Sequence, residues 1–143
     1  MSSRPAIERA QVKTSYNDLF EVRGSAYDHA MRQYPDARDA EFQQVVSRAH
    51  LTSGACVADV PAGGGYLKAY LPNDVTWLGH EPCAGFHHDR GASSPPVSVP
   101  LLPLPWRDHS VDVIISLAGV HHIENKRPLF SAFHSVLKPG GRW

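Results

Sequence analysis

The chain has 143 residues, a length that predicts one domain, and its 42% hydrophobic and 20% charged residues are typical of a globular fold. Fourteen basic residues balance 14 acidic ones, so the net charge offers no electrostatic case for binding nucleic acid or an anionic membrane. No apolar run approaches the roughly 20 residues of a membrane-spanning helix, and the polar N-terminus has no signal-peptide core, so we expect a cytoplasmic protein.

The N-terminal third of the chain is predicted to be helical. Apolar residues recur at spacings of three and four over residues 27–50, which predicts an amphipathic helix, and residues 16–20 allow a shorter one. Three residues with helical spacing precede the first predicted strand: Tyr27, Met31 and Tyr34. We interpret residues 1–52 as an N-terminal helical cap, whose apolar face either closes over a ligand as a lid or packs on the sheet.

Beyond this cap, strands alternate with helices. The pattern predicts, in chain order, a strand over 56–60, a tight turn over 61–65, a short helix over 66–71, a second strand over 75–80 and a weak third strand over 97–99. Residues 111–117 form the most apolar strand, and residues 127–137 carry the apolar stripe of a helix. Such alternation predicts a doubly wound α/β layer with a parallel sheet, so we interpret residues 53–143 as one core.

The C-terminal residues predict a further strand. Lys138, Gly140 and Gly141 are typical of a helix end that is followed by a turn. The next strand would begin near Arg142, and the chain stops at Trp143. We therefore expect a fragment or a truncated gene product.

Three residues follow or end the predicted strands in positions where ligands bind. Asp59 lies near the end of the first strand, Glu81 follows the second, and Leu117 ends the most apolar one. Because the carboxyl ends of parallel strands meet at one edge of a sheet, we expect these residues near one cleft. A carboxylate at Glu81 can accept two charge-assisted hydrogen bonds from vicinal ribose hydroxyls, although a solvated surface acid is the alternative.

The glycine-rich turn over 61–65 joins a strand to a helix. Glycines there let the backbone approach a ligand closely, and the helix that follows offers free N–H groups. A connection that binds nothing is the alternative. The dinucleotide fingerprint needs a glycine where Lys68 stands, and no Gly-Lys-Ser/Thr sequence follows, so the turn matches neither phosphate motif and disfavours a nicotinamide-dependent oxidoreductase.

Motifs in a fixed order extend this interpretation. Residues 57–65 resemble the pattern D-x-G-x-G-x-G, and residues 104–114 resemble L-P-F-x-D-x-S-F-D-V-V. His121-His122 and residues 137–141 match an H-H pair and the sequence L-K-P-G-G that follow them. Over residues 54–143 the chain resembles class I S-adenosylmethionine-dependent methyltransferases, and within them it is similar to the ubiquinone/menaquinone-biosynthesis group and its small-molecule relatives. The resemblance implies a Rossmann-like sheet, of which about four to five strands are present.

The resemblance also implies a site for S-adenosylmethionine. The matching positions are Asp59, Ala62, Gly63 and Gly65 for the methionine part, Glu81 for the ribose hydroxyls, Leu101 and Leu102 beside the adenine, and Leu117 and Ala118 for the floor. Two prolines depart from the family pattern. Pro61 stands at the first motif glycine and removes an N–H, and Pro100 stands where the family often has an Asp that bonds the adenine amino group.

The implied activity is methyl transfer to a small-molecule acceptor by in-line displacement. Because the sulfonium methyl is already activated, the main task of the protein is to position the nucleophile. His121 or His122 is a candidate general base for an acceptor that is protonated at neutral pH, and the alternative is that one packs on the sheet while the other caps a turn. A non-catalytic or truncated protein that only binds S-adenosylmethionine is the second hypothesis, favoured by Pro100 and the stop at Trp143.

No metal site is expected, although the chain has nine histidines. His87-His88 and His121-His122 are adjacent pairs, and neighbouring side chains point apart in a strand or diverge on a helix. Of the two cysteines, Cys56 is expected to be buried in a strand, and Cys83 is expected near the cofactor without acting as a nucleophile. The partners we expect are a small-molecule acceptor and neither nucleic acid nor a membrane, and no oligomeric state is predicted.

Overall fold

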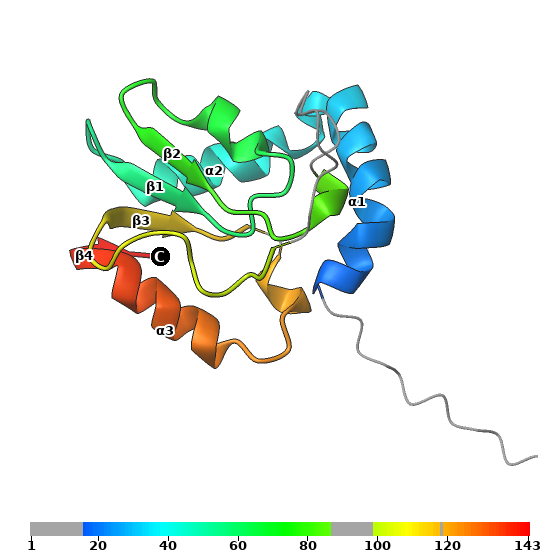
Figure 1. The fold of residues 1–143 in the computed structure, drawn as a ribbon. Helices are drawn as coiled ribbons and strands as arrows, with labels where there is room; N and C mark the ends of the chain where they lie inside the picture. The colour runs from blue at the N-terminus through cyan, green and yellow to red at the C-terminus, as the bar shows by residue number, and fades with distance from the viewer. Residues whose placement is uncertain (1–15, 87–98, 118) are drawn as a thin grey trace, which may run out of the picture.

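The computed structural model describes residues 16–86, 99–117 and 119–143, which form one sheet of four parallel strands in the order β2-β1-β3-β4 (Figure 1). The strands are β1 (Cys56–Asp59), β2 (Thr76–Gly79), β3 (Val111–Ile115) and β4 (Leu137–Arg142). The α-helices of these ranges are α1 (Tyr16–Gln33), α2 (Asp39–Ala49) and α3 (Arg127–Val136). Short 3₁₀ helices lie between them: η1 (Pro35–Arg38), η2 (Tyr66–Tyr70), η3 (Ala84–Phe86) and η4 (Val120–His122).

Strands β1, β2 and β3 end level with one another at one edge of the sheet. Asp59, the last residue of β1, pairs with Gly79 of β2 on one side and with Ile115 of β3 on the other. Beyond this edge lies α1, which contacts η3 (Figure 1). The glycine turn, η3 and η4 all follow strand ends, so the topology brings them to the same side of the molecule.

Side chains of β1 and β3 alternate between two apolar layers, because successive residues of a strand face opposite sides. One buried cluster joins the sheet to α1, α2 and η2 and contains Val57, Val113, Ile115, Met31, Phe42 and Leu67. The other joins the sheet to α3 and includes Ala58, Ile114, Leu129, Phe133 and Val136. Helices thus cover both faces of a parallel sheet, which confirms the predicted doubly wound α/β architecture.

The N-terminal helices differ from the prediction of one helix over residues 27–50. The structure has α1 from Tyr16 to Gln33, then the turn η1, and then α2 from residue 39. Pro35 explains the break, because it has no N–H to donate and it disfavours helical angles at the residue before it. Tyr34 accordingly has φ −125° and ψ 67°, outside the helical region. The short helix allowed over residues 16–20 is therefore the start of α1.

The C-terminal segment also differs from the prediction. Residues 138–141 were expected to form a turn, whereas they belong to strand β4, which pairs with β3. The pairing runs from Val111 opposite Leu137 to Val113 opposite Arg142, and the register shifts between these two pairs. The extra residues on β4 include Gly140 with φ +80°, a left-handed conformation that glycine adopts at no steric cost. β3 therefore has a strand on each side.

The other predicted elements are confirmed with small shifts of their bounds. The segments 56–60, 66–71, 75–80, 111–117 and 127–137 correspond to β1, η2, β2, β3 and α3. In the weak strand predicted over 97–99, residues 97 and 98 lie outside the described residues. Val99 is exposed and not in a strand, and its N–H donates to the carbonyl of Pro82 at 2.9 Å.

Candidate active site

The glycine turn after β1 is folded by its own backbone. The N–H of Ala62 donates to the carbonyl of His80 at 2.9 Å, and the N–H of Gly65 donates to the carbonyl of Ala62 at 3.0 Å. Gly63 has φ +56° and Gly65 has φ +81°, both in the left-handed region that side chains with a Cβ disfavour. The backbone conformation at these two positions thus favours glycine.

Glu81 is tied to this turn and is not a solvated surface acid, since only 6% of it is exposed. Its Oε1 accepts a hydrogen bond from the backbone N–H of Gly63 at 2.8 Å, and its Oε2 accepts one from the N–H of Cys83 at 2.9 Å. The carboxylate therefore links the end of β2 to the turn that follows β1.

Asp59 is the most deeply buried acid at this edge, with 3% of its surface exposed. Burial raises the pKa of Asp59 to about 7, and the nearby charge of Glu81 adds to the rise. A hydrogen bond from Trp77 Nε1 to Asp59 Oδ2 at 3.1 Å acts in the opposite direction but does not offset burial. A cationic ligand group beside Asp59 would favour its ionised form.

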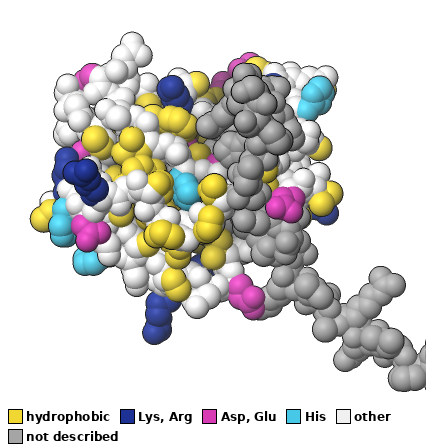
Figure 2. All heavy atoms as spheres, in the orientation of Figure 1, with side chains coloured by type: hydrophobic (Ala, Val, Ile, Leu, Met, Phe, Trp, Pro, Cys, Tyr) yellow, Lys and Arg dark blue, Asp and Glu magenta, His cyan; other side chains and the backbone are white. Residues whose placement is uncertain are grey.

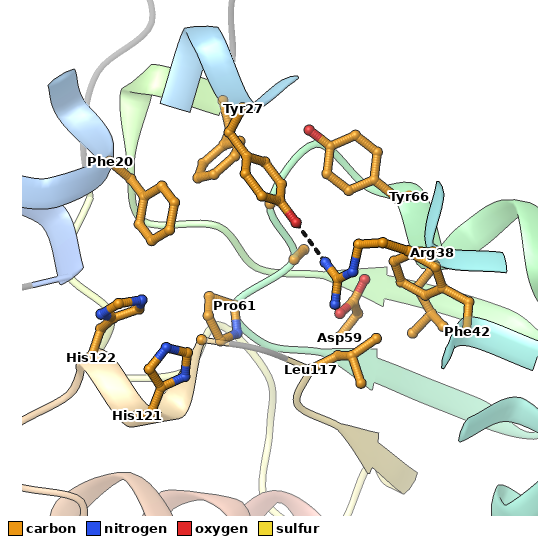
Figure 3. Close-up of a pocket in the computed structure, with 15 residues that line it drawn as sticks. Phe20, Tyr27, Arg38, Phe42, Asp59, Pro61, Tyr66, Leu117, His121 and His122 are labelled. Carbon is orange, nitrogen blue, oxygen red and sulfur yellow. Dashed lines mark hydrogen bonds between the residues drawn. The ribbon is translucent and has the colours of Figure 1, made fainter. Parts of the chain in front are cut away.

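A cavity of about 450 Å³ lies against these residues. Six of the residues predicted from the sequence line it: Asp59, Ala62, Gly63, Leu117, His121 and His122 (Figure 3). They come from the ends of β1 and β3, the glycine turn and η4, as the parallel topology requires.

The remaining predicted residues do not line this cavity. Gly65 closes the turn through its bond to Ala62, and Glu81 is hydrogen-bonded to Gly63, which does line the cavity. Leu101 and Leu102 are half-buried and pack against the apolar cluster beneath α3. Ala118 lies outside the described residues, and Pro100, the departure from the family pattern, is exposed.

The two histidines of η4 lie together, contrary to the expectation that adjacent side chains diverge. Their ring centroids are 3.9 Å apart, and both side chains line the cavity. Burial, together with the neighbouring His121, lowers the pKa of His122 below its ordinary value, which favours the neutral imidazole. The pair His87-His88 lies outside the described residues. Within those residues, no group of three or more His, Cys, Asp or Glu side chains is arranged to hold a metal ion.

Helical residues that the sequence did not single out form the rest of the cavity wall. They are Phe20, Arg38, Phe42, Tyr66, Leu67 and Phe86, together with Pro61 and Gly119. Of the predicted lid face, Tyr27 lines the cavity, Met31 is buried in the core, and Tyr34 is exposed. The helical spacing indicated an inward face, but it held no information on which inward residue reaches the cavity.

Arg38 places a cation in the cavity wall. Its Nε and Nη2 donate to the two carboxylate oxygens of Glu41 at 2.7 and 2.6 Å, and its Nη1 donates to the Tyr27 hydroxyl at 2.5 Å. The hydrogen bonds from Arg38 hold the pKa of Glu41 below its usual value. A guanidinium has five N–H donors, so these three bonds leave others for a ligand.

Asp28 connects α1 to the glycine turn. It is 5% exposed, and its two oxygens accept hydrogen bonds from the Tyr66 hydroxyl at 2.7 Å and from Arg32 Nε at 2.8 Å. A Cβ added to Gly64 would lie 2.5 Å from Asp28 Oδ1, so the carboxylate sits directly against the turn. Burial and the bond to Asp28 raise the pKa of Tyr66, which keeps its hydroxyl protonated as a donor.

Both cysteines have free thiols. Cys56 is half-buried rather than fully buried, and its N–H donates to Asp112 Oδ2 at 2.8 Å. Cys83 is fully buried near Glu81, and burial raises the pKa of its thiol, which disfavours a nucleophilic thiolate.

The sequence matches one protein family, and the fold is similar to those of solved structures. The family described as "Methyltransferase domain" matches residues 58–143. A search of curated protein sequences gives no significant match.

Several solved structures are similar to this chain, including the following three. A proposed methyltransferase in a complex with the Trm112 methyltransferase activator of Haloferax volcanii has a TM-score of 0.66 at 20% identity, over 85% of this chain and 57% of that one. A proposed S-adenosylmethionine-dependent methyltransferase from Methanococcus maripaludis has a TM-score of 0.65 at 17% identity, over 99% and 64%. A methyltransferase from Aquifex aeolicus has a TM-score of 0.57 at 17% identity, over 78% and 68%. The chain thus spans less than two thirds of the length of the first two structures.

Proposed function

This chain belongs to the methyltransferase-domain family, and we propose that it transfers a methyl group from S-adenosylmethionine to a small-molecule acceptor. The fold is the Rossmann-like class I methyltransferase fold, and the cofactor implied by the family is S-adenosylmethionine. When bound, this cofactor supplies an electrophilic methyl group on a sulfonium. The observation that carries the proposal is the cavity lined by Asp59 at the end of β1, by Gly63 of the glycine turn and by the two histidines of η4.

The charges of the cavity fit the amino-acid end of this cofactor. Its ammonium group suits Asp59, whose pKa of about 7 would fall on contact with a cation. Its carboxylate suits the N–H donors of Arg38, which lines the same cavity. The backbone of Ala62, Gly63 and Gly65 would hold the methionine part of the cofactor, because the glycine turn brings backbone rather than side chains to the ligand.

The nucleoside end of the cofactor is assigned to residues that follow the glycine turn in the sequence. We assign the ribose hydroxyls to Glu81, whose bonds to the N–H groups of Gly63 and Cys83 fix the orientation of its carboxylate. Leu101 and Leu102 are assigned to the adenine, and Leu117 with Ala118 to the floor of the site. Pro100 offers no carboxylate to the adenine amino group, so backbone groups and apolar contacts would recognise the ring.

In the transfer, this chain positions the acceptor and takes up a proton. Either His121 or His122 would accept it, and the lowered pKa of His122 makes a neutral imidazole available near neutral pH. The helix α1, held against the turn by Asp28 and Tyr66, would exclude water from the site. We propose the corresponding domain division, with residues 1–52 as the cap and residues 53–143 as the core.

A small acceptor is favoured over a macromolecule by the shape and charge of the molecule. The cavity holds about 450 Å³, and acidic and basic side chains are scattered over the face shown in Figure 2. Nucleic-acid binding would call for a basic stripe or patch. Among the described residues, no helix has both the length and the apolar character that crossing a membrane requires.

A non-catalytic protein that only binds the cofactor is the second candidate, and the exposed Pro100 is the observation in its favour. Titration calorimetry of the full chain with S-adenosylhomocysteine tests the site that both candidates share. Asp59→Asn is expected to weaken binding at least about tenfold, and Asp74→Asn, in an exposed turn, is the control. Formation of S-adenosylhomocysteine from the methyl donor and an acceptor separates the two, since only the enzyme turns over.

A further inference from the structure

We propose that the aromatic end of the cavity, formed by Phe20, Tyr27, Phe86 and His122, binds the methyl acceptor as a flat ring whose hydroxyl group faces the histidine pair. The acceptor class is thus a neutral phenol or enol, and the reaction is O-methylation. This inference rests on the proposed methyltransferase function, because it assigns the acceptor to the part of the cavity that is not assigned to the cofactor.

The four rings form one cluster. The centroids of Phe20 and Phe86 are 5.2 Å apart, and the ring of Tyr27 lies edge-on to both, at 6.1 and 6.0 Å. The ring of His122 lies edge-on to Phe20 at 5.7 Å. These separations lie within the roughly 4.5–7 Å at which aromatic pairs attract one another. All four side chains line the same cavity, so a planar ligand would extend an existing aromatic arrangement.

The rings of Phe20, Tyr27 and Phe86 belong to a small apolar cluster between α1 and η3. The two elements also touch through backbone, since a Cβ on Gly24 would lie 2.9 Å from the carbonyl carbon of Gly85. A Cβ on Gly85 would lie 2.1 Å from the carbonyl oxygen of Phe20. The rings flank this contact and face the cavity, where an apolar ligand would contact them.

The aromatic cluster lies away from the end of the cavity that is assigned to the amino-acid part of the cofactor. In Figure 3, Phe20 and His122 lie on one side of Pro61, whereas Asp59 and Arg38 lie on the other. The charged side chains of the cavity wall are thus gathered at the end assigned to the amino-acid part of the cofactor. The aromatic end offers rings, the two histidines and the Tyr27 hydroxyl, which already accepts a hydrogen bond from Arg38. Such a surface suits a neutral aromatic ring that carries a hydroxyl group.

The histidine pair accounts for the hydroxyl group. A neutral imidazole accepts a hydrogen bond from a phenol, and the lowered pKa of His122 favours that form. In the reaction the hydroxyl proton moves to the imidazole nitrogen, and an oxygen lone pair forms the new bond to the methyl carbon. The electrons of the broken carbon–sulfur bond remain on the sulfur, which becomes a neutral thioether. No further reactant is needed.

The test uses the full chain with saturating S-adenosylhomocysteine and three probes of one skeleton. They are 2-naphthol, its saturated analogue decahydro-2-naphthol, and naphthalene, which has no hydroxyl. Affinities are measured by fluorescence or titration calorimetry. We expect 2-naphthol to bind at least about tenfold more tightly than the saturated alcohol, because aromatic contacts add to apolar burial. Equal affinities for these two would overturn the proposal.

Variants locate the binding. Phe20→Leu and Phe86→Leu should each weaken 2-naphthol binding about three- to tenfold while the affinity for S-adenosylhomocysteine stays within about twofold. Phe130→Leu, on α3 and outside the cavity, is the matched control. Thermal melting checks that each variant folds. If Phe86→Leu does not fold, Phe20→Leu alone provides the test, because Phe20 is less buried than Phe86. His122→Ala should weaken 2-naphthol but not naphthalene.

The outcomes also separate this proposal from the one it rests on. If S-adenosylhomocysteine does not bind the chain, the proposed function fails. If it binds but competes with 2-naphthol, or if the ring variants weaken it as much as they weaken 2-naphthol, then the aromatic end belongs to the cofactor and this proposal alone fails.

Discussion

The backbone N–H of Gly63 donates a hydrogen bond of 2.8 Å to the carboxylate of Glu81, which ties the turn after β1 to the end of β2. Both residues were singled out from the sequence, but only the fold shows that they bond to each other. Replacing Glu81 is therefore expected to change the turn as well as the assigned ribose contact.

Glu81→Ala should weaken S-adenosylhomocysteine about tenfold or more through lost ribose bonds. It should also lower the free energy of unfolding by about 1–3 kcal/mol, because the N–H groups of Gly63 and Cys83 lose their acceptor. Calorimetry and urea unfolding measure the two effects, with Asp74→Ala in an exposed turn as the control. An unchanged affinity would remove Glu81 from the site.

Gly63→Val should abolish S-adenosylhomocysteine binding, because a side chain would block the approach of a ligand to the backbone. The matched control is Gly54→Val. Gly54 also has a positive φ, +79°, so a side chain causes a similar backbone strain of about 1–2 kcal/mol, but a Cβ there meets nothing within 4 Å. Calorimetry should thus show binding for the Gly54 variant alone. Retained binding by Gly63→Val would mean that the turn is purely structural.

Tyr66→Phe should weaken cofactor binding by releasing α1 from the glycine turn. The substitution removes the hydroxyl that donates to Asp28, and the buried carboxylate loses one of its hydrogen bonds. A double-mutant cycle with Asp28→Asn in urea unfolding should give a coupling energy of about 0.5–3 kcal/mol. Tyr34→Phe, at an exposed position, is the control. Additive effects of the two substitutions would show that the bond does not couple helix and turn.

The buried Asp59 should make the stability of the ligand-free protein fall as pH rises. Its pKa is about 7 in the folded chain against an ordinary value of 3.8, so the folded state binds more protons between these values. The favourable contribution is present below about pH 4 and is lost as pH rises through about 7. Unfolding free energies measured from pH 4 to 8 should show a decline that Asp59→Asn flattens. Identical pH profiles for the two proteins would exclude a raised pKa for Asp59.

The sequence alone was sufficient to predict the strands and helices that are marked by local patterns of apolar and turn residues. Apolar runs and turn residues placed β1, β2, β3 and α3, and alternation of strands with helices implied a parallel sheet with Asp59 and Glu81 at one edge. The prediction failed where one residue outweighed the pattern. Pro35 interrupts the helix predicted over 27–50, and the glycines before Arg142 are accommodated in an irregular strand rather than a turn.

Tertiary structure decided which side chains meet across the site. Arg38 has no local pattern that marks it, and it reaches the cavity from η1, which follows the helix break at Tyr34. The contact of Phe20 with Phe86 joins segments far apart in the chain, and such contacts depend on how α1 packs rather than on spacing. Periodicity specifies which face of a helix is buried, because that face follows from backbone geometry. What the face touches is set by the packing of the whole molecule.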